Sequence, residues 1–152
     1  MKEESLLLLS DLQKLINQVV LIDYTIIILG GAEMIRVLIV EDQRMAREDM
    51  ENYIQSSGRY CLAASITNAA MAETVCRQSK CELVLMDVCT ENDESGLVAA
   101  EKIKRTMPQI KIIIVTSLVE CSFIDRARKA GVESFWYKDA GKENCWRLWI
   151  AR

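Results

Sequence analysis

The chain has 152 residues, of which 51% are hydrophobic and 27% charged, which suits one folded domain and excludes a wholly disordered chain. Its formal net charge is -3, so it lacks the positive charge that direct binding to a nucleic-acid backbone requires. It has no histidine, which excludes histidine-ligated metals, serine–histidine or cysteine–histidine nucleophile pairs and a phosphohistidine of its own.

Cysteine usage and the N-terminal sequence both bear on the compartment. The six cysteines are too sparse for a disulfide scaffold, and none are spaced as Cys-x-x-Cys, so we expect free thiols that serve mainly as small buried hydrophobes. Glu3 and Glu4 stand where a signal peptide carries positive charge. The apolar stretch Leu15–Leu29 is interrupted by polar residues and is too short to cross a bilayer. The sequence therefore predicts a cytoplasmic protein with no membrane partner.

Residues 1–33 are predicted to form an N-terminal extension. A helical stripe is followed by a short extended stretch, Tyr24–Leu29, which ends at two glycines. The stripe consists of Leu8, Leu12, Leu15, Val19 and Ile22. This extension is a candidate partner-binding helix or dimerisation coil, so a homodimer is one hypothesis. A second hypothesis makes Met34 the native start, because residues 30–33 can be encoded by a purine-rich ribosome-binding sequence.

Residues 34–152 show short apolar runs that alternate with amphipathic stretches. The predicted strands are 35–40, 60–66, 83–86, 110–115 and 134–137, and the predicted helices are 44–56, 69–79, 97–106, 121–130 and 142–151. Such alternation favours an α/β fold: a doubly wound, five-stranded parallel sheet with helices on both faces. The last helix is atypical because it is crowded with tryptophan and aliphatic residues, and a frameshift that replaced its native end is one hypothesis.

Polar residues follow four of the predicted strands. Glu41 and Asp42 come after the first strand, Asp87 after the third, Thr116 after the fourth and Lys138 after the fifth. Ligands of open α/β sheets bind at the carboxyl ends of the strands, so we expect these side chains to converge at one edge.

Clustered carboxylates repel one another, and a hard divalent cation relieves that repulsion. Mg²⁺ prefers oxygen ligands, so Asp42 and Asp87 are candidate ligands, with Glu41 positioning a water and the main-chain carbonyl of Cys89 as a further oxygen. Lys138 and Thr116 supply positive charge and a hydrogen-bond donor for a transferring phosphoryl group. The pattern predicts an aspartate that accepts phosphate.

Four segments, in order, resemble the receiver domain of two-component response regulators: residues 35–42, 82–87, 111–117 and 135–139. The resemblance implies a flavodoxin-like strand order 2-1-3-4-5. It also implies a set of roles: Asp87 as phosphoacceptor, Glu41 and Asp42 as the acidic pair for Mg²⁺, Thr116 as the switch hydroxyl, Lys138 as the phosphate-contacting lysine and Phe135 as the aromatic switch residue.

The resemblance further implies a signalling module that a sensor histidine kinase phosphorylates, not an enzyme acting on other substrates. The Lys-Asp-Ala sequence from Lys138 resembles the subgroup whose receivers precede a LuxR-type helix-turn-helix domain. Residues 34–152 are just enough for a receiver, so DNA would be contacted only through a C-terminal domain that is absent here.

Two departures from the family pattern concern the loop after Asp87 and the residues that tune dephosphorylation. The loop is one residue longer, with Glu91 where a proline is usual and Gly96 at the ninth position instead of the eighth. Cys89 and Leu118 cannot orient a water strongly, which predicts slow autodephosphorylation.

Two other functions remain open for this sequence. The first alternative to a phosphorylated receiver is a non-phosphorylated interaction module of the same fold. A weaker one is a Mg²⁺-dependent phosphohydrolase, which would need a second acid where Cys89 stands.

Overall fold

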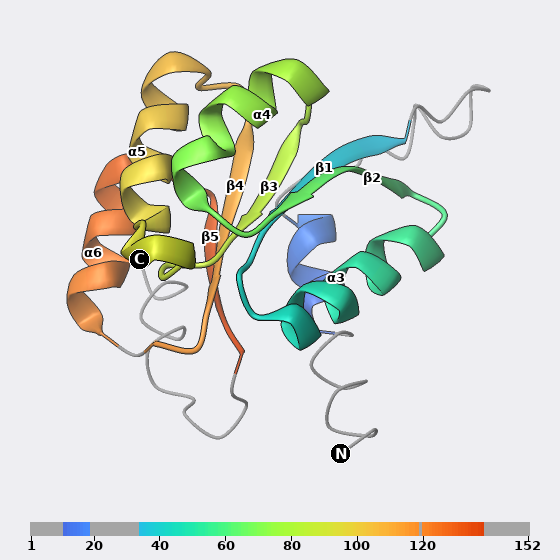
Figure 1. Cartoon of the computed structure of the whole chain (residues 1–152), viewed down its shortest axis with the longest axis horizontal. Coiled ribbons are helices and arrows are strands. Elements are labelled where there is room, and N and C mark those ends of the chain that lie inside the picture. Colours follow the sequence, from blue (N-terminus) through green and yellow to red (C-terminus); the bar gives the residue numbers. More distant parts are fainter. Residues whose placement is uncertain (1–10, 19–33, 119, 139–152) are drawn as a thin grey trace.

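Five parallel strands form one sheet in the order β2-β1-β3-β4-β5, which confirms the predicted topology (Figure 1). The computed structural model describes residues 11–18, 34–118 and 120–138. The strands are β1 (Ile35–Val40), β2 (Tyr60–Ile66), β3 (Leu83–Met86), β4 (Lys111–Thr116) and β5 (Ser134–Tyr137). Strand β3 is buried along its whole length, as expected for a central strand covered on both faces.

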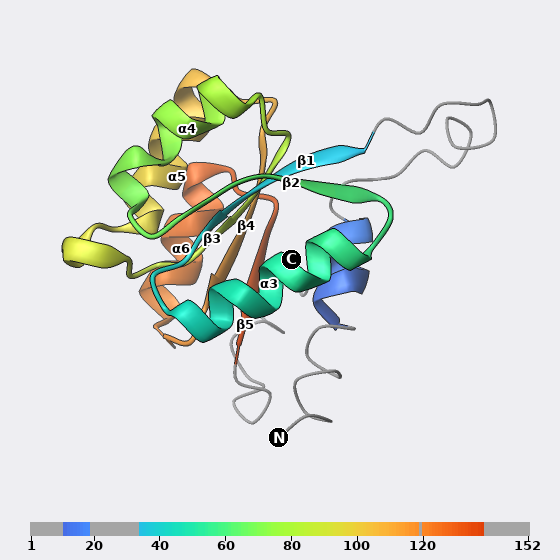
Figure 2. The ribbon, with the colours of Figure 1, turned by 45° about the vertical axis from the view of Figure 1, so that its right-hand side comes forward.

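Helices cover both faces of this sheet. On one face lie α4 (Ala72–Ser79), α5 (Gly96–Thr106) and α6 (Cys121–Ala130), and on the other lies α3 (Arg44–Ser56) (Figures 1 and 2). Two short 3-10 turns, η1 (Ala69–Met71) and η2 (Glu91–Asp93), precede α4 and α5. Among the described residues, no helix combines the length and the hydropathy that crossing a bilayer demands.

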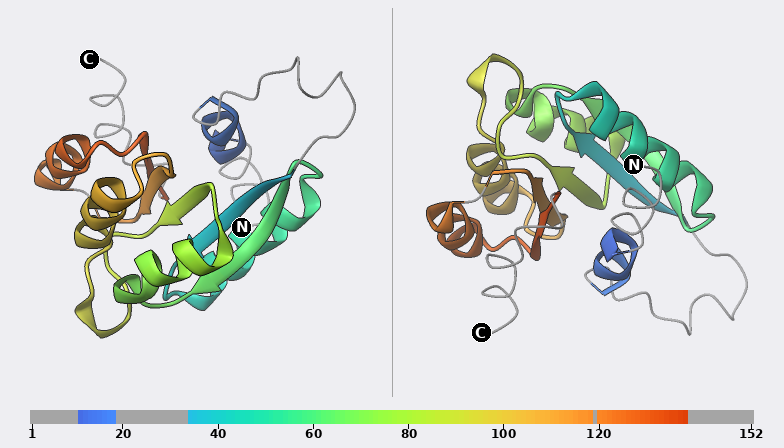
Figure 3. Two further views of the ribbon diagram at one scale, coloured as in Figure 1. Left: turned by 90° about the horizontal axis from the view of Figure 1, so that it is seen from above. Right: turned by 90° about the horizontal axis from the view of Figure 1, so that it is seen from below.

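Residues 11–18 form a helix that lies on the same side of the sheet as α3 (Figures 2 and 3). Leu12 and Ile16 are fully buried and belong to the same apolar cluster as Val37 of β1 and Val115 of β4. The expected stripe is therefore right for Leu12 but missed Ile16, one residue beyond the half-buried Leu15. This part of the N-terminal extension packs on the core of the domain.

The predicted element boundaries differ from the structure in a few places. Strand β4 runs one residue later than predicted, because Ile110 N–H donates to the Met107 carbonyl in a turn whereas the Thr116 carbonyl still accepts a hydrogen bond from Lys138. Helix α5 begins one residue early, at Gly96, and η2 was not predicted. The extended stretch at 24–29 and the helix at 142–151 lie outside the described residues.

Candidate functional site

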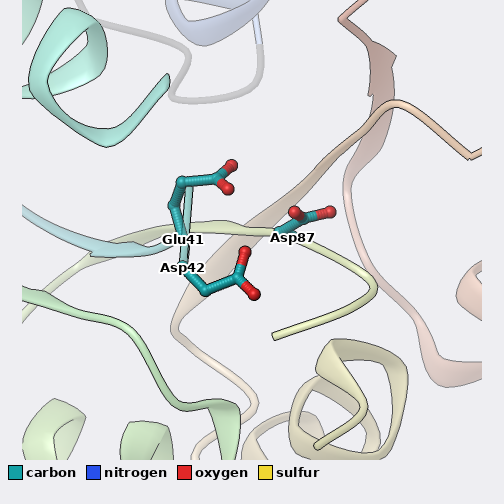
Figure 4. Close-up of side chains that lie close together, drawn as sticks. All are labelled: Glu41, Asp42 and Asp87. Carbon is teal, nitrogen blue, oxygen red and sulfur yellow. The ribbon is translucent and has the colours of Figure 1, made fainter. Parts of the chain in front are cut away.

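Three carboxylates meet at the carboxyl ends of β1 and β3 (Figure 4). Glu41 and Asp42 follow β1, and Asp87 follows β3. Because these strands are paired side by side, with Val40 opposite Met86, the residues that leave them are neighbours. One oxygen from each carboxylate lies within 4.8 Å of the others. The structure thus brings together the acidic residues that the sequence singled out.

Glu41 is the most deeply buried of the three, with no exposed surface. Its Oε1 accepts a hydrogen bond from the main-chain N–H of Gln43 at 3.0 Å, and its Oε2 accepts one from the Lys138 ammonium group. Burial raises the pKa of Glu41, although the bond and the charge of Lys138 oppose the rise. Glu41 is therefore held inside the site against Lys138 without facing solvent.

Asp87 is 6% exposed, and both of its carboxylate oxygens have donors. Oδ1 accepts from the main-chain N–H of Val88 at 2.7 Å, and Oδ2 accepts from Lys138 Nζ at 3.1 Å. The main-chain N–H of Lys138 donates to the Thr116 carbonyl at 2.9 Å, which fixes the lysine at the end of β5 beside β4. One ammonium group thus bridges Glu41 and Asp87, as charge-assisted hydrogen bonds favour.

Asp42 is exposed, and its main chain is held by a residue that the sequence analysis missed. Arg47 of α3 donates from one guanidinium nitrogen to the carbonyl of Glu41 at 3.0 Å and to that of Asp42 at 3.2 Å. The side chain also pairs with Glu51, with 3.7 Å between Nε and Oε1. An arginine near the start of a surface helix is usually solvated, so no pattern in the sequence pointed to this role.

Thr116 reaches the same edge as the last residue of β4, and it is fully buried. Its Oγ1 accepts a hydrogen bond from the main-chain N–H of Leu118 at 3.2 Å. A second contact holds the same loop: the Tyr137 hydroxyl donates to the Ser117 carbonyl at 2.6 Å. The predicted switch hydroxyl is therefore engaged with its own loop in this conformation, and Tyr137 is an additional partner that the sequence did not indicate.

Phe135, the predicted aromatic switch residue, lies in β5 and is 4% exposed. It belongs to the apolar cluster beneath α4, α5 and α6, which also contains Ile124 and Ala127 of α6. In this conformation its side chain is part of the core against α6, and a switching role for it stays a prediction.

The longer loop after Asp87 carries extra acidic residues away from the carboxylate group. Glu91 accepts a hydrogen bond from the Thr67 hydroxyl, and its N–H donates to the Thr67 carbonyl at 3.0 Å, so it is fastened to the loop after β2. Within the described part of the chain, the carboxylate group contains Glu41, Asp42 and Asp87, without the acids of this loop. The longer loop therefore packs against the loop after β2 and adds no carboxylate to the group of Glu41, Asp42 and Asp87.

The arrangement can bind a hard cation and hold a negatively charged group beside Asp87. The Lys138 ammonium group contacts two of the three carboxylates, Glu41 and Asp87, so the partly buried site has more acidic than basic groups and favours a divalent ion. Lys138 lies within hydrogen-bond distance of Asp87 and is positioned to offset charge added to it.

Comparison with known proteins identifies relatives of this chain. A family model described as the response regulator receiver domain matches residues 37–147. Response regulator protein VraR of Staphylococcus aureus is 33% identical over 104 residues, which cover 68% of this chain and 49% of that protein. The chain thus spans about half the length of the curated relatives that it matches.

Two solved structures share the fold. One is a DNA-binding response regulator of the LuxR family from Staphylococcus aureus, with a TM-score of 0.65 and 23% identity over 76% of this chain and 92% of that chain. The other is the response regulator domain of Thermotoga maritima CheB, with a TM-score of 0.65 and 24% identity over 76% of this chain and 87% of that chain. At these identities the two structures support the fold alone.

Proposed function

The chain belongs to the response regulator receiver family, and from this we propose that Asp87 accepts a phosphoryl group from a partner sensor histidine kinase in the presence of Mg²⁺. The observation that carries the proposal is the nearly buried Asp87 carboxylate, bonded to Lys138 and to the Val88 N–H. In the transfer, the P–N bond of the donor phosphohistidine breaks and a P–O bond to Asp87 forms. The electron pair of the broken bond stays with the donor imidazole.

Mg²⁺ fits the donor set of Glu41, Asp42 and Asp87. All three offer carboxylate oxygen, and one oxygen of each lies within 4.8 Å of the others, so Asp42 and Asp87 could ligate a magnesium ion that Glu41 reaches through a water. Asp42 is exposed, so it is the carboxylate of the three that solvent reaches most readily. A bound ion would neutralise charge on the phosphoryl oxygens. The main-chain carbonyl of Cys89, two residues after Asp87, is proposed as a further ligand.

Lys138 and Thr116 are proposed to respond to phosphorylation. Lys138 already contacts Asp87 and would contact an added phosphoryl oxygen instead. The Thr116 Oγ1 accepts from the Leu118 N–H, and moving this hydroxyl toward the phosphoryl group, to which it would donate, would exchange that loop contact for one to the phosphate. That exchange would bias the loop between β4 and α6 toward a second conformation, and with it the packing of Phe135 beneath α6, which is a population shift between two states.

A small phosphoryl donor tests the proposal without a kinase. Phosphoramidate carries a P–N bond like that of phosphohistidine, and with Mg²⁺ the full chain is expected to gain about 80 Da by intact mass. Asp87→Asn should abolish the gain. Asp93→Asn makes the same chemical change in the neighbouring loop, outside the carboxylate group, and should preserve it. A gain that persists in Asp87→Asn would show that another residue is modified.

The alternatives make different predictions in the same assay. A wild-type chain that gains no mass but still binds Mg²⁺ would support the non-phosphorylated interaction module. Sustained turnover of a phosphomonoester would support a phosphohydrolase. That activity is disfavoured because Cys89 occupies the position of the second acid, and partial burial together with the charges of Asp87 and Asp42 raises the pKa of its thiol. A thiol with a raised pKa is a poor proton donor to a leaving group.

The proposed output is transcriptional. The similar LuxR-family protein from Staphylococcus aureus is named a DNA-binding response regulator. We propose that contact with DNA belongs to a helix-turn-helix domain outside residues 34–152, that the sensor kinase is the direct partner of the receiver and that signalling takes place in the cytoplasm. Homodimerisation through the N-terminal extension stays a hypothesis, which sedimentation with and without phosphoramidate would test.

A further inference from the structure

The loop after β3 closes on itself through a short antiparallel pair. Cys89 lies opposite Ser95, and the hydrogen bonds of this pair are formed by the residues on either side. These bonds run from the Thr90 N–H to the Glu94 carbonyl, at 3.1 Å, and from the Gly96 N–H to the Val88 carbonyl, at 2.8 Å. In a pair of this kind, the two central residues direct their own N–H and C=O groups away from each other. The Cys89 carbonyl is therefore on the outer side of the loop, open to another partner.

The hydroxyl of Thr90 fastens this loop at its base. Thr90 is only 4% exposed. Its Oγ1 donates to the Glu94 carbonyl at 2.7 Å and accepts from the N–H of Ala69, the first residue of η1, at 2.9 Å. The bond to Ala69 is buried, whereas the side-chain bond between Thr67 and Glu91 is exposed to water. One hydroxyl thus joins the two sides of the loop and ties them to the segment after β2.

The tip of the loop is less firmly held than its base. Asn92 and Asp93 both adopt left-handed conformations, with φ of 61° and 58°. Such conformations cost free energy for residues other than glycine, although asparagine and aspartate tolerate them best. The turn bond from the Glu94 N–H to the Glu91 carbonyl is long, at 3.4 Å, and no residue of η2 is buried. Closure of the loop therefore depends on the two bonds of the Thr90 hydroxyl.

We propose that Thr90 is a positioning residue for Mg²⁺, whose hydroxyl keeps the loop in the closed form that fixes the Cys89 carbonyl as a metal ligand. This role depends on the magnesium site proposed above, and Thr90 is the residue that makes the longer loop compatible with that site. Thr90 acts through the main chain of Cys89, which precedes it directly, and touches neither the ion nor the phosphoryl group. When the loop opens, the carbonyl loses its fixed place, so the site binds Mg²⁺ more weakly.

Thr90→Val tests this role because it removes the hydroxyl and keeps the shape of the side chain. By titration calorimetry with MgCl₂, we expect an affinity about tenfold weaker than that of the wild type. Thr90→Ser restores the hydroxyl and should stay within about twofold of the wild type. Thr106→Val makes the same chemical change at an exposed threonine at the far end of α5, and it should leave the affinity unchanged. An unchanged affinity in Thr90→Val would overturn the proposal.

A general loss of stability has to be separated from a loss of metal affinity. Thr90→Val leaves the buried Ala69 N–H without its acceptor, so the urea midpoint of unfolding should also fall. Leu12→Ala truncates a core side chain away from this loop, so it should lower the midpoint and keep the affinity for Mg²⁺. Equal losses of affinity in these two variants would assign the effect to destabilisation and overturn the proposal.

Hydrogen exchange tests the coupling in the wild-type chain, with no variant that could fold poorly. If the closed loop binds Mg²⁺ about tenfold more tightly than the open loop, saturating Mg²⁺ must favour closure by the same factor. Exchange of the Ala69 amide, measured by NMR, should therefore slow by about tenfold. The Ile110 amide, which donates to Met107 at the opposite end of the sheet, should keep its rate. An unchanged rate at Ala69, or equal slowing of both amides, would overturn the proposal.

These measurements also separate this role from the proposed phosphorylation. A wild-type chain that gains no mass from phosphoramidate, yet shows the expected magnesium affinities, would refute phosphorylation and support the role of Thr90. A chain that gains mass at Asp87, while Thr90→Val binds Mg²⁺ as the wild type does, would support phosphorylation and refute the role of Thr90. A wild-type chain that binds no Mg²⁺ would overturn the role of Thr90.

Discussion

Gly96 lies against the main chain of Asp87: a β carbon at Gly96 would stand 1.7 Å from the Asp87 carbonyl oxygen. The N–H of Gly96 also donates to the Val88 carbonyl at 2.8 Å. The first residue of α5 is thus fastened to the segment that positions the phosphoacceptor. Any side chain at position 96 must displace the backbone of Asp87.

Gly96→Ala should therefore disturb both stability and phosphorylation. We expect the free energy of unfolding to fall by about 2 kcal/mol or more, because overpacking against backbone cannot relax by rotation of a side chain. Phosphorylation by phosphoramidate should slow by roughly tenfold or more, since misplaced reacting groups lose rate steeply. Urea unfolding and intact mass measure the two effects.

Gly58→Ala is the control for that substitution. Nothing lies within 4 Å of a β carbon at Gly58, but its φ of +69° costs an alanine about 1 kcal/mol. It should lose some stability and keep normal phosphorylation. Normal phosphorylation in Gly96→Ala would show that the loop absorbs the clash.

Arg47→Ala should weaken magnesium binding through the main chain of Glu41 and Asp42. Loss of both carbonyl contacts releases the segment after β1, so we expect a severalfold weaker affinity for Mg²⁺ and slower phosphorylation, as for other groups that orient metal ligands. Titration calorimetry with MgCl₂ measures the affinity. Arg44→Ala removes a largely exposed arginine that pairs with Glu48 on the same helix, and it should leave the affinity unchanged. Equal effects in the two variants would assign the change to lost surface charge.

Leu12→Ala tests whether the helix at residues 11–18 belongs to the core. Leu12 has no exposed surface, so truncation should cost about 2–4 kcal/mol of unfolding free energy. Lys14→Ala, on the exposed face of the same helix, should change stability by less than about 0.5 kcal/mol. Urea unfolding compares them. An unaffected Leu12→Ala protein would mean that this helix adds no stability to the domain, in keeping with the hypothesis that Met34 is the native start.

Tyr53→Phe should stabilise the protein, and more so at alkaline pH. The Tyr53 hydroxyl is buried and has no hydrogen-bond partner among the described residues, so its removal should gain about 1 kcal/mol near pH 8. Burial raises the pKa of Tyr53 from 10.0 to about 12, so the folded state holds the proton more tightly than the unfolded chain. The contribution of the protonated Tyr53 hydroxyl to the free energy of unfolding is complete below pH 10 and is lost as the pH rises toward 12.

Unfolding in urea between pH 8 and 11 should therefore show a gap between Tyr53→Phe and wild type that widens above pH 10. Tyr60→Phe is the matched control, because the Tyr60 hydroxyl donates to Asn17 Oδ1 at 2.6 Å. That variant should lose stability near neutral pH. A constant gap across the pH range would mean that Tyr53 titrates as in the unfolded chain.

The sheet and its acidic edge could be predicted from sequence because they depend on local pattern and on one topological rule. Continuous apolar runs predict buried strands. Because β1 and β3 are parallel neighbours, the residues that follow them lie side by side, so Glu41, Asp42 and Asp87 could be placed at one edge of the sheet. Lys138 was found for the same reason.

Other features depend on contacts between distant segments. Arg47 could not be assigned, because its bonds are to main-chain carbonyls that no side-chain pattern reveals. The burial of Ile16 depends on which part of the helix meets the sheet, and a stripe drawn over residues 8–22 does not determine that. The anchoring of Glu91 to Thr67 depends on the fold of the inserted loop, so the sequence left open whether the extra acids join the site.

The helix at residues 11–18 has a consequence for synthesis of the chain on the ribosome. Leu12 and Ile16 are covered by a cluster that includes Val115, which is translated about 100 residues later. At about 5–20 residues per second, this apolar segment waits on the order of 5–20 s for strand β4, which supplies the last fully buried residue of that cluster. During that interval the apolar face of residues 11–18 has no complete surface to pack against and is exposed to aggregation.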